Sequence, residues 1–156
     1  MIRNPYKAVL SYWNFKNTKS HTKTINANSL HSEAFKQFAK VGIQRWMEVI
    51  SDWLQYSVDI HCIYYEELTE DPLSEMRKLL DYLHFQVNEE RLECIDKHSS
   101  GSFHRVHHQS EDPWSHELHQ MFDDTIDAAN KMLMEKVGRS LPLSKYQYYR
   151  SELLKS

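Results

Sequence analysis

The side chains best suited to chemistry stand near the start of the 156-residue chain, where Arg3, Asn4 and Pro5 are followed by Ser11. Pro5 suits the first turn of a helix and Asn4 suits the N-cap before it. Residues 1–3 would end an extended strand, and a strand that leads directly into the open N–H groups of a helix start is a natural anion site. Arg3 adds a charged fork for phosphate oxygens and Ser11 a hydroxyl donor. The segment predicts a phosphate site, and the simpler interpretation is a capped helix with an exposed arginine.

A second group of polar side chains is the histidine-rich segment 96–113, which holds four of the ten histidines. His104, His107 and His108 suggest a metal site by residue type, but no carboxylate or cysteine completes a recognised ligand spacing. We therefore interpret the segment as a polar loop near a site or a partner, expect no metal, and keep His107 or His108 as residues that could help to hold a phosphate.

Two further sets of residues have a structural and a functional interpretation. Asp123, Asp124 and Asp127 are close enough for acid–base work, but such charge runs usually form the solvated face of a helix. Trp46 and Trp53 are expected in the core first and as a carbohydrate platform second.

The elements that must position these residues are mostly helices. Apolar residues at helical spacing and good capping residues predict five helices, over about 5–15, 32–56, 73–83, 88–95 and 116–137. The apolar stripe of the first helix would contain Ala8, Val9, Tyr12 and Phe15. Gly42 would break or kink the second helix, and Gly138 would end the last one.

Only the segment 59–65 has the pattern that predicts a buried strand, and a turn is predicted over 66–72. One strand cannot form a sheet, and residues 1–3 are too short to be a good partner. The sequence therefore indicates a parallel α/β sheet that has lost its first strands. The stretch from Leu141 onward is expected as a surface strand or an irregular extension.

Composition excludes several classes of protein. The formal net charge of −3 argues against a general nucleic-acid or anionic-lipid surface, so an anion site must be local. With 3 glycines, the chain contains no glycine-rich phosphate loop of the usual patterns. No run of about 18 apolar residues and no signal-peptide pattern is present, so the chain as written is expected in the cytosol.

The two cysteines, Cys62 and Cys94, have no zinc-type spacing. Cysteine is among the most often buried residue types, so both are expected as buried thiols. A disulfide between them is an alternative only if the parent protein is lumenal.

The segment from Ile2 to Tyr12 resembles the R-[ND]-P-x(5)-S segment of sulfotransferases that use 3′-phosphoadenosine 5′-phosphosulfate as the sulfate donor. In that family the arginine and the serine hold the 3′-phosphate of the donor. The resemblance therefore assigns this role to Arg3 and Ser11.

A second block, Ile63-Tyr-Tyr-Glu-Glu-Leu-x-x-Asp-Pro72, resembles the buried strand of the family and the turn that ends it. In cytosolic members an aromatic residue at the matching position contacts the adenine. Tyr65 is thus either an adenine contact or a core aromatic, since tyrosine is often half buried with its hydroxyl bonded.

A third block, residues 101–105, stands where sulfotransferases place a basic, glycine-containing loop over the 3′-phosphate. It implies Gly101, Phe103 and Arg105 as donor-binding residues, with Arg105 the preferred phosphate ligand and Lys97 the second. The cytosolic form of the loop is matched only at Lys97 and Gly101. The form found here resembles the WSC-domain-containing group, which also has a tyrosine after R-N-P, paired tryptophans before the strand and a Leu-Pro-Leu-like tail.

The resemblance implies an α/β fold of the P-loop sulfotransferase type that is incomplete, predominantly helical, with a remnant of the parallel sheet. Residues 1–145 would be the C-terminal part of the domain and 146–156 a tail. The phosphosulfate loop and the general base of the family lie before R-N-P, so the isolated chain is expected to be inactive or nearly so.

The same resemblance implies a carbohydrate hydroxyl as the acceptor and the Golgi membrane as the location of the full-length parent. The nucleotide partner would be the donor 3′-phosphoadenosine 5′-phosphosulfate, and no nucleic acid is expected as a partner. The alternative hypothesis is a helical interaction module without chemistry, derived from a truncated sulfotransferase, which would not bind the desulfated donor.

Overall fold

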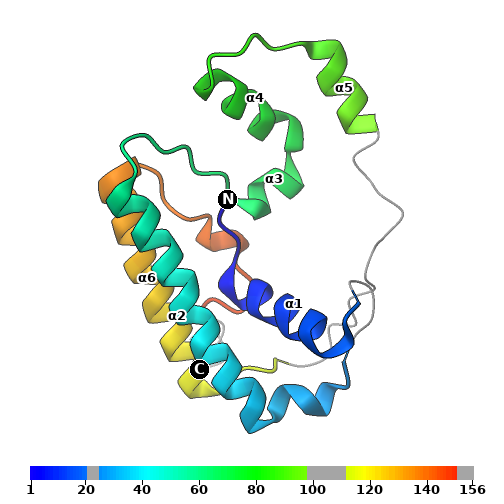
Figure 1. Cartoon of the computed structure of the whole chain (residues 1–156), viewed down its shortest axis with the longest axis vertical. Helices are drawn as coiled ribbons and strands as arrows, with labels where there is room; N and C mark the ends of the chain where they lie inside the picture. Colours follow the sequence, from blue (N-terminus) through cyan, green and yellow to red (C-terminus); the bar gives the residue numbers. More distant parts are fainter. Residues whose placement is uncertain (21–24, 98–111, 151–156) are drawn as a thin grey trace.

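The computed structural model describes residues 1–20, 25–97 and 112–150, and these form a mostly helical structure (Figure 1). The elements in chain order are α1 (Pro5–Thr18), η1 (Ala27–His31), α2 (Glu33–Tyr56), α3 (Tyr65–Glu70), α4 (Pro72–Tyr82), α5 (Glu89–Lys97), α6 (His116–Val137) and η2 (Leu143–Lys145). The long helices α2 and α6 pack side by side, α1 packs against α2, and α3 to α5 form an arm that extends away from them.

The predicted helix starts are confirmed by their capping bonds. The side chain of Asn4 accepts a hydrogen bond from Tyr6 N–H at 3.0 Å, and Ser32 accepts one from Phe35 N–H at 3.2 Å. Ser115 caps α6 in the same way, and Gly138 ends that helix with a φ of 71°. These local signals work because each satisfies backbone groups that a helix end leaves open.

The core lies where α1, α2 and α6 meet, and it buries Tyr6, Val9, Trp13, Phe35, Ala39, Ile43, Phe122, Ile126 and Leu133 among others. The predicted stripe of α1 was wrong in part, because Tyr12 and Phe15 are exposed. The buried face runs instead through Tyr6, Val9 and Trp13, because α1 lies between two helices and presents a different face to each.

Gly42 was expected to break or kink the second helix, but α2 continues through it. A Cβ atom at this position would stand 2.8 Å from Cγ2 of Val9, which is too close for an ordinary contact. The glycine therefore lets α1 and α2 approach closely, a packing role that the sequence does not distinguish from a break.

The segment after the expected strand is also different from the prediction, because residues 65–72 form α3 and the start of α4 rather than a turn. Glu66 and Glu67 lie in the first turn of α3, where negative charge is favoured by the helix dipole. Asp71 then accepts a hydrogen bond from Ser74 N–H at 3.0 Å and caps α4.

Most apolar residues of the arm formed by α3 to α5 are partly exposed, whereas Leu92 of α5 is buried. In α4 only Glu75 is buried. Cys94 of α5 is exposed, contrary to the expectation, whereas Cys62 is buried, and no disulfide joins the two described cysteines. Burial raises the pKa of the Cys62 thiol.

The C-terminal segment packs onto the core instead of lying on the surface as expected. Leu141 and Tyr146 are buried, and the side-chain amide of Asn4 donates to the carbonyl of Gln147 at 3.0 Å. Residues 146–150, which the sequence assigned to a tail, thus contact the start of α1. Within the described ranges, no helix has the length and apolar character needed to cross a membrane.

A buried hydrogen-bond network ties α1 to α6. Tyr6 donates from its hydroxyl to Asp123 at 2.8 Å and lies 3.2 Å from Nδ1 of His119. Nε2 of His119 lies 3.0 Å from a carboxylate oxygen of Asp112. Asp123 is therefore half-buried rather than part of a solvated face, and this burial raises the pKa of its carboxyl.

We expect Tyr6→Phe to lower the free energy of unfolding by about 1–3 kcal/mol, because it leaves buried polar partners unsatisfied. Urea denaturation followed by tryptophan fluorescence measures this loss. The matched control is Tyr12→Phe, in which the hydroxyl of a largely exposed ring is removed and stability should barely change. Equal losses in the two variants would contradict a structural role for the network.

Candidate functional site

The site is built on one parallel β-bridge between Ile2 and Tyr64. Ile2 N–H donates to the carbonyl of Ile63, and Tyr65 N–H donates to the carbonyl of Ile2, both at 2.8 Å. In this parallel register the next residues, Arg3 and Tyr65, fall on the same side of the pair. The guanidinium of Arg3 lies 4.4 Å from the centroid of the Tyr65 ring, in cation–π contact.

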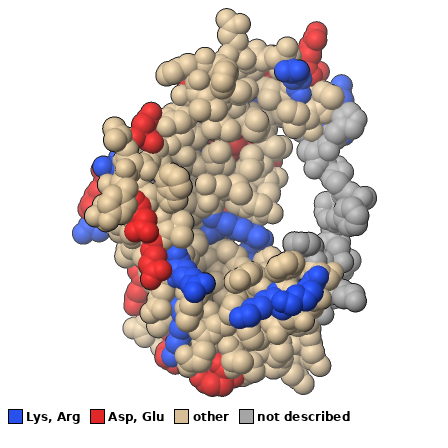
Figure 2. Space-filling model, in the orientation of Figure 1, with Lys and Arg blue, Asp and Glu red and all other residues tan. Residues whose placement is uncertain are grey.

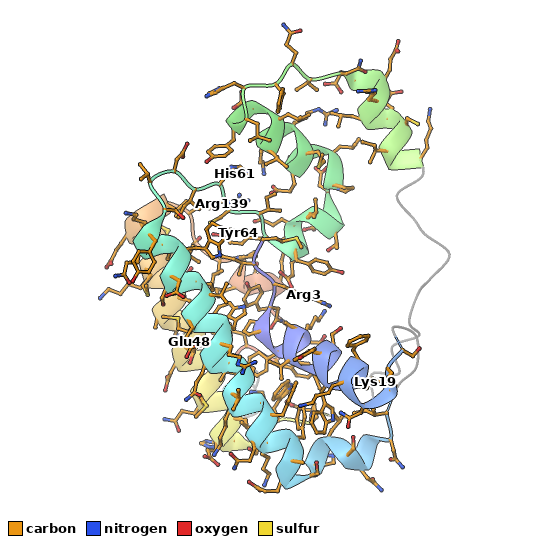
Figure 3. All side chains as sticks on the ribbon, viewed as in Figure 1. Arg3, Lys19, Glu48, His61, Tyr64 and Arg139 are labelled. Atoms are coloured by element: carbon orange, nitrogen blue, oxygen red, sulfur yellow. The ribbon has the colours of Figure 1, made fainter. Side chains whose placement is uncertain are left out.

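Helix α2 fixes the backbone at the same point. The indole Nε1 of Trp46, a half-buried residue of α2, donates a hydrogen bond to the carbonyl of Arg3 at 3.0 Å. This bond holds the backbone of Arg3 against α2. Figure 3 shows Arg3 at the junction between the start of α1 and the segment that leads into α3. The placement of Arg3 is thus determined by the bridge, by the Tyr65 ring and by Trp46 together.

Among the described residues, Arg3 has no carboxylate partner to balance its charge. Its Nε is buried and has no hydrogen-bond partner within the part of the chain that the structure describes. It also forms no ion pair with any carboxylate in those residues. A buried donor of this kind favours an external acceptor, because an unsatisfied charged group costs free energy.

The start of α1 leaves fewer backbone N–H groups open to an anion than the sequence suggested. Pro5 has no N–H, the N–H of Tyr6 is taken by the Asn4 side chain, and that of Ala8 by the Asn4 carbonyl. The N–H of Asn4 donates to Glu66 at 3.0 Å, which places a carboxylate beside the helix end. An anion must therefore be held chiefly by side chains.

Two residues of α1 extend the site beyond Arg3. Ser11 is half-buried, and its hydroxyl makes no hydrogen bond to another described residue. Lys7 stands four residues before Ser11 and four after Arg3, so it is one helical turn from Ser11 on the same side. Sequence reasoning missed Lys7, although this spacing of four could have identified it. Figure 2 shows basic side chains gathered on the face over α1.

Of the remaining residues that were predicted to bind the donor, the structure describes Lys97 alone and does not bring it to this point. Lys97 is exposed at the end of α5, which packs against α4 and lies well away from α1 in Figure 1. Gly101, Phe103 and Arg105 lie outside the described residues, as do His104, His107 and His108. Among the residues that are described, no group of three or more metal-ligating side chains gathers.

The opposite edge of the segment 60–65 is closed by Arg139, which follows α6. Its guanidinium donates to the carbonyl of Cys62 at 2.7 Å, pairs with Glu67, and lies 4.6 Å from the centroid of the Tyr64 ring. Tyr64 donates from its hydroxyl to the carbonyl of Arg139 at 3.1 Å, and burial raises the pKa of Tyr64 to about 12. Figure 3 shows Arg139 next to Tyr64.

Glu75 completes this cluster from α4. It is buried, pairs with Lys78 at 2.5 Å and lies 3.5 Å from the Arg139 guanidinium. Arg139 therefore links α6, the extended segment and the arm, and the arm carries Tyr65.

A model of the sulfotransferase domain family matches residues 1–138. The chain belongs to the sulfotransferase domain family. A WSCD family member of Aedes aegypti is 25% identical over 129 residues, which cover 80% of this chain and 40% of the relative.

Two further relatives are a second WSCD family member and a protein named sulfotransferase 1A1. A WSCD family member of Drosophila melanogaster is 23% identical over 109 residues, covering 67% of this chain and 34% of that protein. Sulfotransferase 1A1 of Rattus norvegicus is 30% identical over 103 residues, covering 64% of this chain and 35% of the enzyme. The chain thus spans about 40% or less of the length of these relatives. No solved structure matches it.

We expect Arg139→Ala to lower the free energy of unfolding by about 2–4 kcal/mol, because it removes a partner of buried Glu75 and the donor to the Cys62 carbonyl. The matched control is Arg150→Ala, which breaks the exposed pair with Asp127 and should cost much less. Urea denaturation of both variants makes the comparison. A loss for Arg139→Ala no greater than for Arg150→Ala would contradict its linking role.

Proposed function

We propose that this chain supplies the part of a sulfotransferase that holds the 3′-phosphate of 3′-phosphoadenosine 5′-phosphosulfate. The observation that carries the proposal is the Arg3 guanidinium, which lies over the Tyr65 ring and whose buried Nε has no hydrogen-bond partner among the described residues. Membership of the sulfotransferase family supports the choice of this donor over other phosphorylated ligands.

Each residue has a distinct part in binding. Arg3 offers a planar pair of donors to two phosphate oxygens. Ser11 donates from its hydroxyl, and Lys7 adds a mobile positive charge that offsets the carboxylate of Glu66. Tyr65 holds the guanidinium in place through one face of its ring, so an adenine contact would use its other face or its edge.

The residues predicted in the loop region complete the proposed site. Arg105 would be a second phosphate ligand, and Gly101 and Phe103 would shape the loop over the nucleotide, whereas Lys97 lies at the end of α5, away from Arg3. These roles follow from the resemblance of the segment to the WSC-domain-containing group.

Bound donor supplies the sulfuryl group, and transfer also requires cationic groups on the sulfonate and a base for the acceptor hydroxyl. We infer that a phosphosulfate loop of the P-loop type and a base outside this chain provide them. The isolated chain would then bind nucleotide and turn over little donor. The likeness to WSCD family members favours a carbohydrate acceptor and a Golgi location for a full-length parent.

A second candidate function is a helical interaction module without chemistry. The exposed apolar side chains of α2, among them Val41, Val49 and Trp53, favour this alternative. The two functions differ in one measurable property, because a module of this kind would not bind the desulfated donor.

Isothermal titration with 3′-phosphoadenosine 5′-phosphate tests the proposed function. We expect binding by the chain and a loss of roughly 10- to 100-fold in affinity for Arg3→Ala, because a charge-assisted contact is removed. The control Lys131→Ala removes an exposed cation of α6 and should leave affinity within about twofold. The absence of binding by the unmodified chain would favour the interaction module.

Variants of Tyr65 distinguish a ring that supports the Arg3 guanidinium from a hydroxyl that forms a hydrogen bond. Tyr65→Phe keeps the aromatic face and should bind the nucleotide almost as well as the unmodified chain. Tyr65→Leu removes that face and should weaken binding by roughly 3- to 10-fold, the range of a partly desolvated cation–π contact. In the Arg3→Ala background the Leu substitution should then have a smaller effect. Equal losses in the Phe and Leu variants would contradict this role.

A further inference from the structure

A buried line of polar groups joins α6 to the first turn of α1, and its contacts restrict where protons can lie. His119 and Tyr6 are 2% and 0% exposed. Nε2 of His119 lies 3.0 Å from a carboxylate oxygen of Asp112, and Nδ1 lies 3.2 Å from the Tyr6 hydroxyl. That hydroxyl lies 2.8 Å from Asp123. The line therefore has a carboxyl group at each end and three contacts along it.

Each of the three contacts needs its own proton, because two acceptor atoms that face each other repel. A carboxylate only accepts, so the contact with Asp112 requires a proton on Nε2 of His119. Tyr6 has a single hydroxyl proton, and its shortest contact directs this proton to Asp123, with the carbonyl of His119 as a further acceptor at 3.1 Å. With a neutral imidazole and two ionised carboxylates, no proton remains for the contact between Nδ1 and the Tyr6 oxygen.

One additional proton completes the line. On Nδ1, it makes His119 an imidazolium that donates to both of its neighbours. On Asp123, it makes the carboxyl a donor to Tyr6, and Tyr6 then donates to Nδ1. Both arrangements hold the same number of protons, so the proton belongs to the line as a whole. Burial raises the pKa of the Asp123 carboxyl, which is the direction that retains a proton.

The groups around the line favour this additional proton. The titratable groups on α6, on the segment before it and on the C-terminal segment are Asp112, His116, Asp123, Asp127, Tyr148 and Arg150. Two basic side chains are engaged elsewhere, since Lys40 of α2 pairs with Glu117 at 2.6 Å and Arg150 with Asp127 at 2.7 Å. Tyr148 stays neutral because burial raises its pKa. Two carboxyl groups thus face one imidazole, and a proton held between them reduces their repulsion.

The line ends close to the proposed anion site. Tyr6 lies in the first turn of α1, three positions after Arg3, and its backbone N–H donates to the N-cap Asn4 at 3.0 Å. Its hydroxyl is the group that bonds this turn to α6. A shift of Tyr6 would therefore move the N-cap, and with it the backbone from which Arg3 extends over the Tyr65 ring.

We propose that the folded chain holds one additional proton between His119 and Asp123, through Tyr6, at neutral pH, and that this proton positions the start of α1 and Arg3. His119 and Asp123 are then positioning residues that make the anion site sensitive to pH. Loss of the proton leaves Nδ1 and the Tyr6 oxygen as two facing acceptors and loosens the turn. The effect on nucleotide binding rests on the proposed function, whereas the retention of the proton does not.

The dependence of stability on pH tests whether the proton is held. The unfolding equilibrium is measured in urea for the unmodified chain, for His119→Asn and for the exposed control His116→Gln. An unfolded chain loses its histidine protons at about pH 6.5, so above this pH the unmodified chain releases the additional proton when it unfolds. We expect its unfolding constant to rise with pH by up to about tenfold per unit relative to His119→Asn. His116→Gln should show the same rise as the unmodified chain.

Two variants of His119 test the effect on Arg3 through the binding of 3′-phosphoadenosine 5′-phosphate. Asn places an amide at the position of Nδ1, where it donates to Tyr6 without a titrating proton, whereas Gln reaches toward Asp112 and leaves Tyr6 without this donor. We expect the affinity of the unmodified chain, relative to His119→Asn, to fall by roughly 3- to 10-fold as the proton is lost. Titration of the ligand phosphate cancels in this ratio. His119→Gln should bind more weakly than His119→Asn at pH 7, although glutamine is the better helix former.

Equal pH dependence of unfolding in the unmodified chain and in His119→Asn would overturn the proposal, and so would loss of that dependence in His116→Gln. Parallel binding profiles for the unmodified chain and His119→Asn would overturn the control of Arg3. If the unmodified chain binds no nucleotide, the proposed function and the control of Arg3 both fail, and the unfolding measurements still decide whether the proton is held. Circular dichroism checks that each variant is folded. If His119→Asn is not, Tyr6→Phe replaces it, since it removes the hydroxyl that joins His119 to Asp123.

Discussion

The register of the Ile2–Tyr64 bridge is the constraint on which the rest of the site depends. A parallel pair has a side-chain period of two, so a shift of one residue would move Arg3 to the other face and away from Tyr65. So short a pairing cannot define its own register. Trp46 and Arg139 therefore act from opposite sides, one bonded to the carbonyl of Arg3 and the other to that of Cys62.

The electrostatics of the site follow from the same arrangement. A helix start normally attracts anions through its free N–H groups, but here Asn4 and Pro5 leave few of them open and Glu66 adds a negative charge. In the proposed site an anion would then be held by the side chains of Arg3, Lys7 and Ser11. A site of this type depends on geometry more than on overall charge, which is consistent with a chain whose formal net charge is −3.

The sequence predicted those features whose cause is local. Asn4, Ser32, Ser115 and Gly138 were assigned correctly as helix ends, because each cap involves residues within a few positions along the chain. Features with a distant cause were missed. Gly42 was taken for a break because its reason is the side chain of Val9 on another helix, and nothing near Arg139 in the sequence indicates that it closes a strand edge. Burial of the C-terminal segment was missed for the same reason, since its partners lie on α1 and α6.

The hydrogen bond between the Asn4 side chain and the carbonyl of Gln147 has a consequence for the order in which the protein is made. The two residues are separated by 143 positions, so the first emerges from a ribosome long before the second has been added. At about 5–20 residues per second this interval is roughly 7 to 30 seconds. During this interval the side-chain oxygen of Asn4 can cap α1, but its side-chain amide nitrogen lacks the carbonyl of Gln147 as a hydrogen-bond partner. The start of α1, although it is made before Gln147, therefore reaches its final surroundings only after that residue has been added.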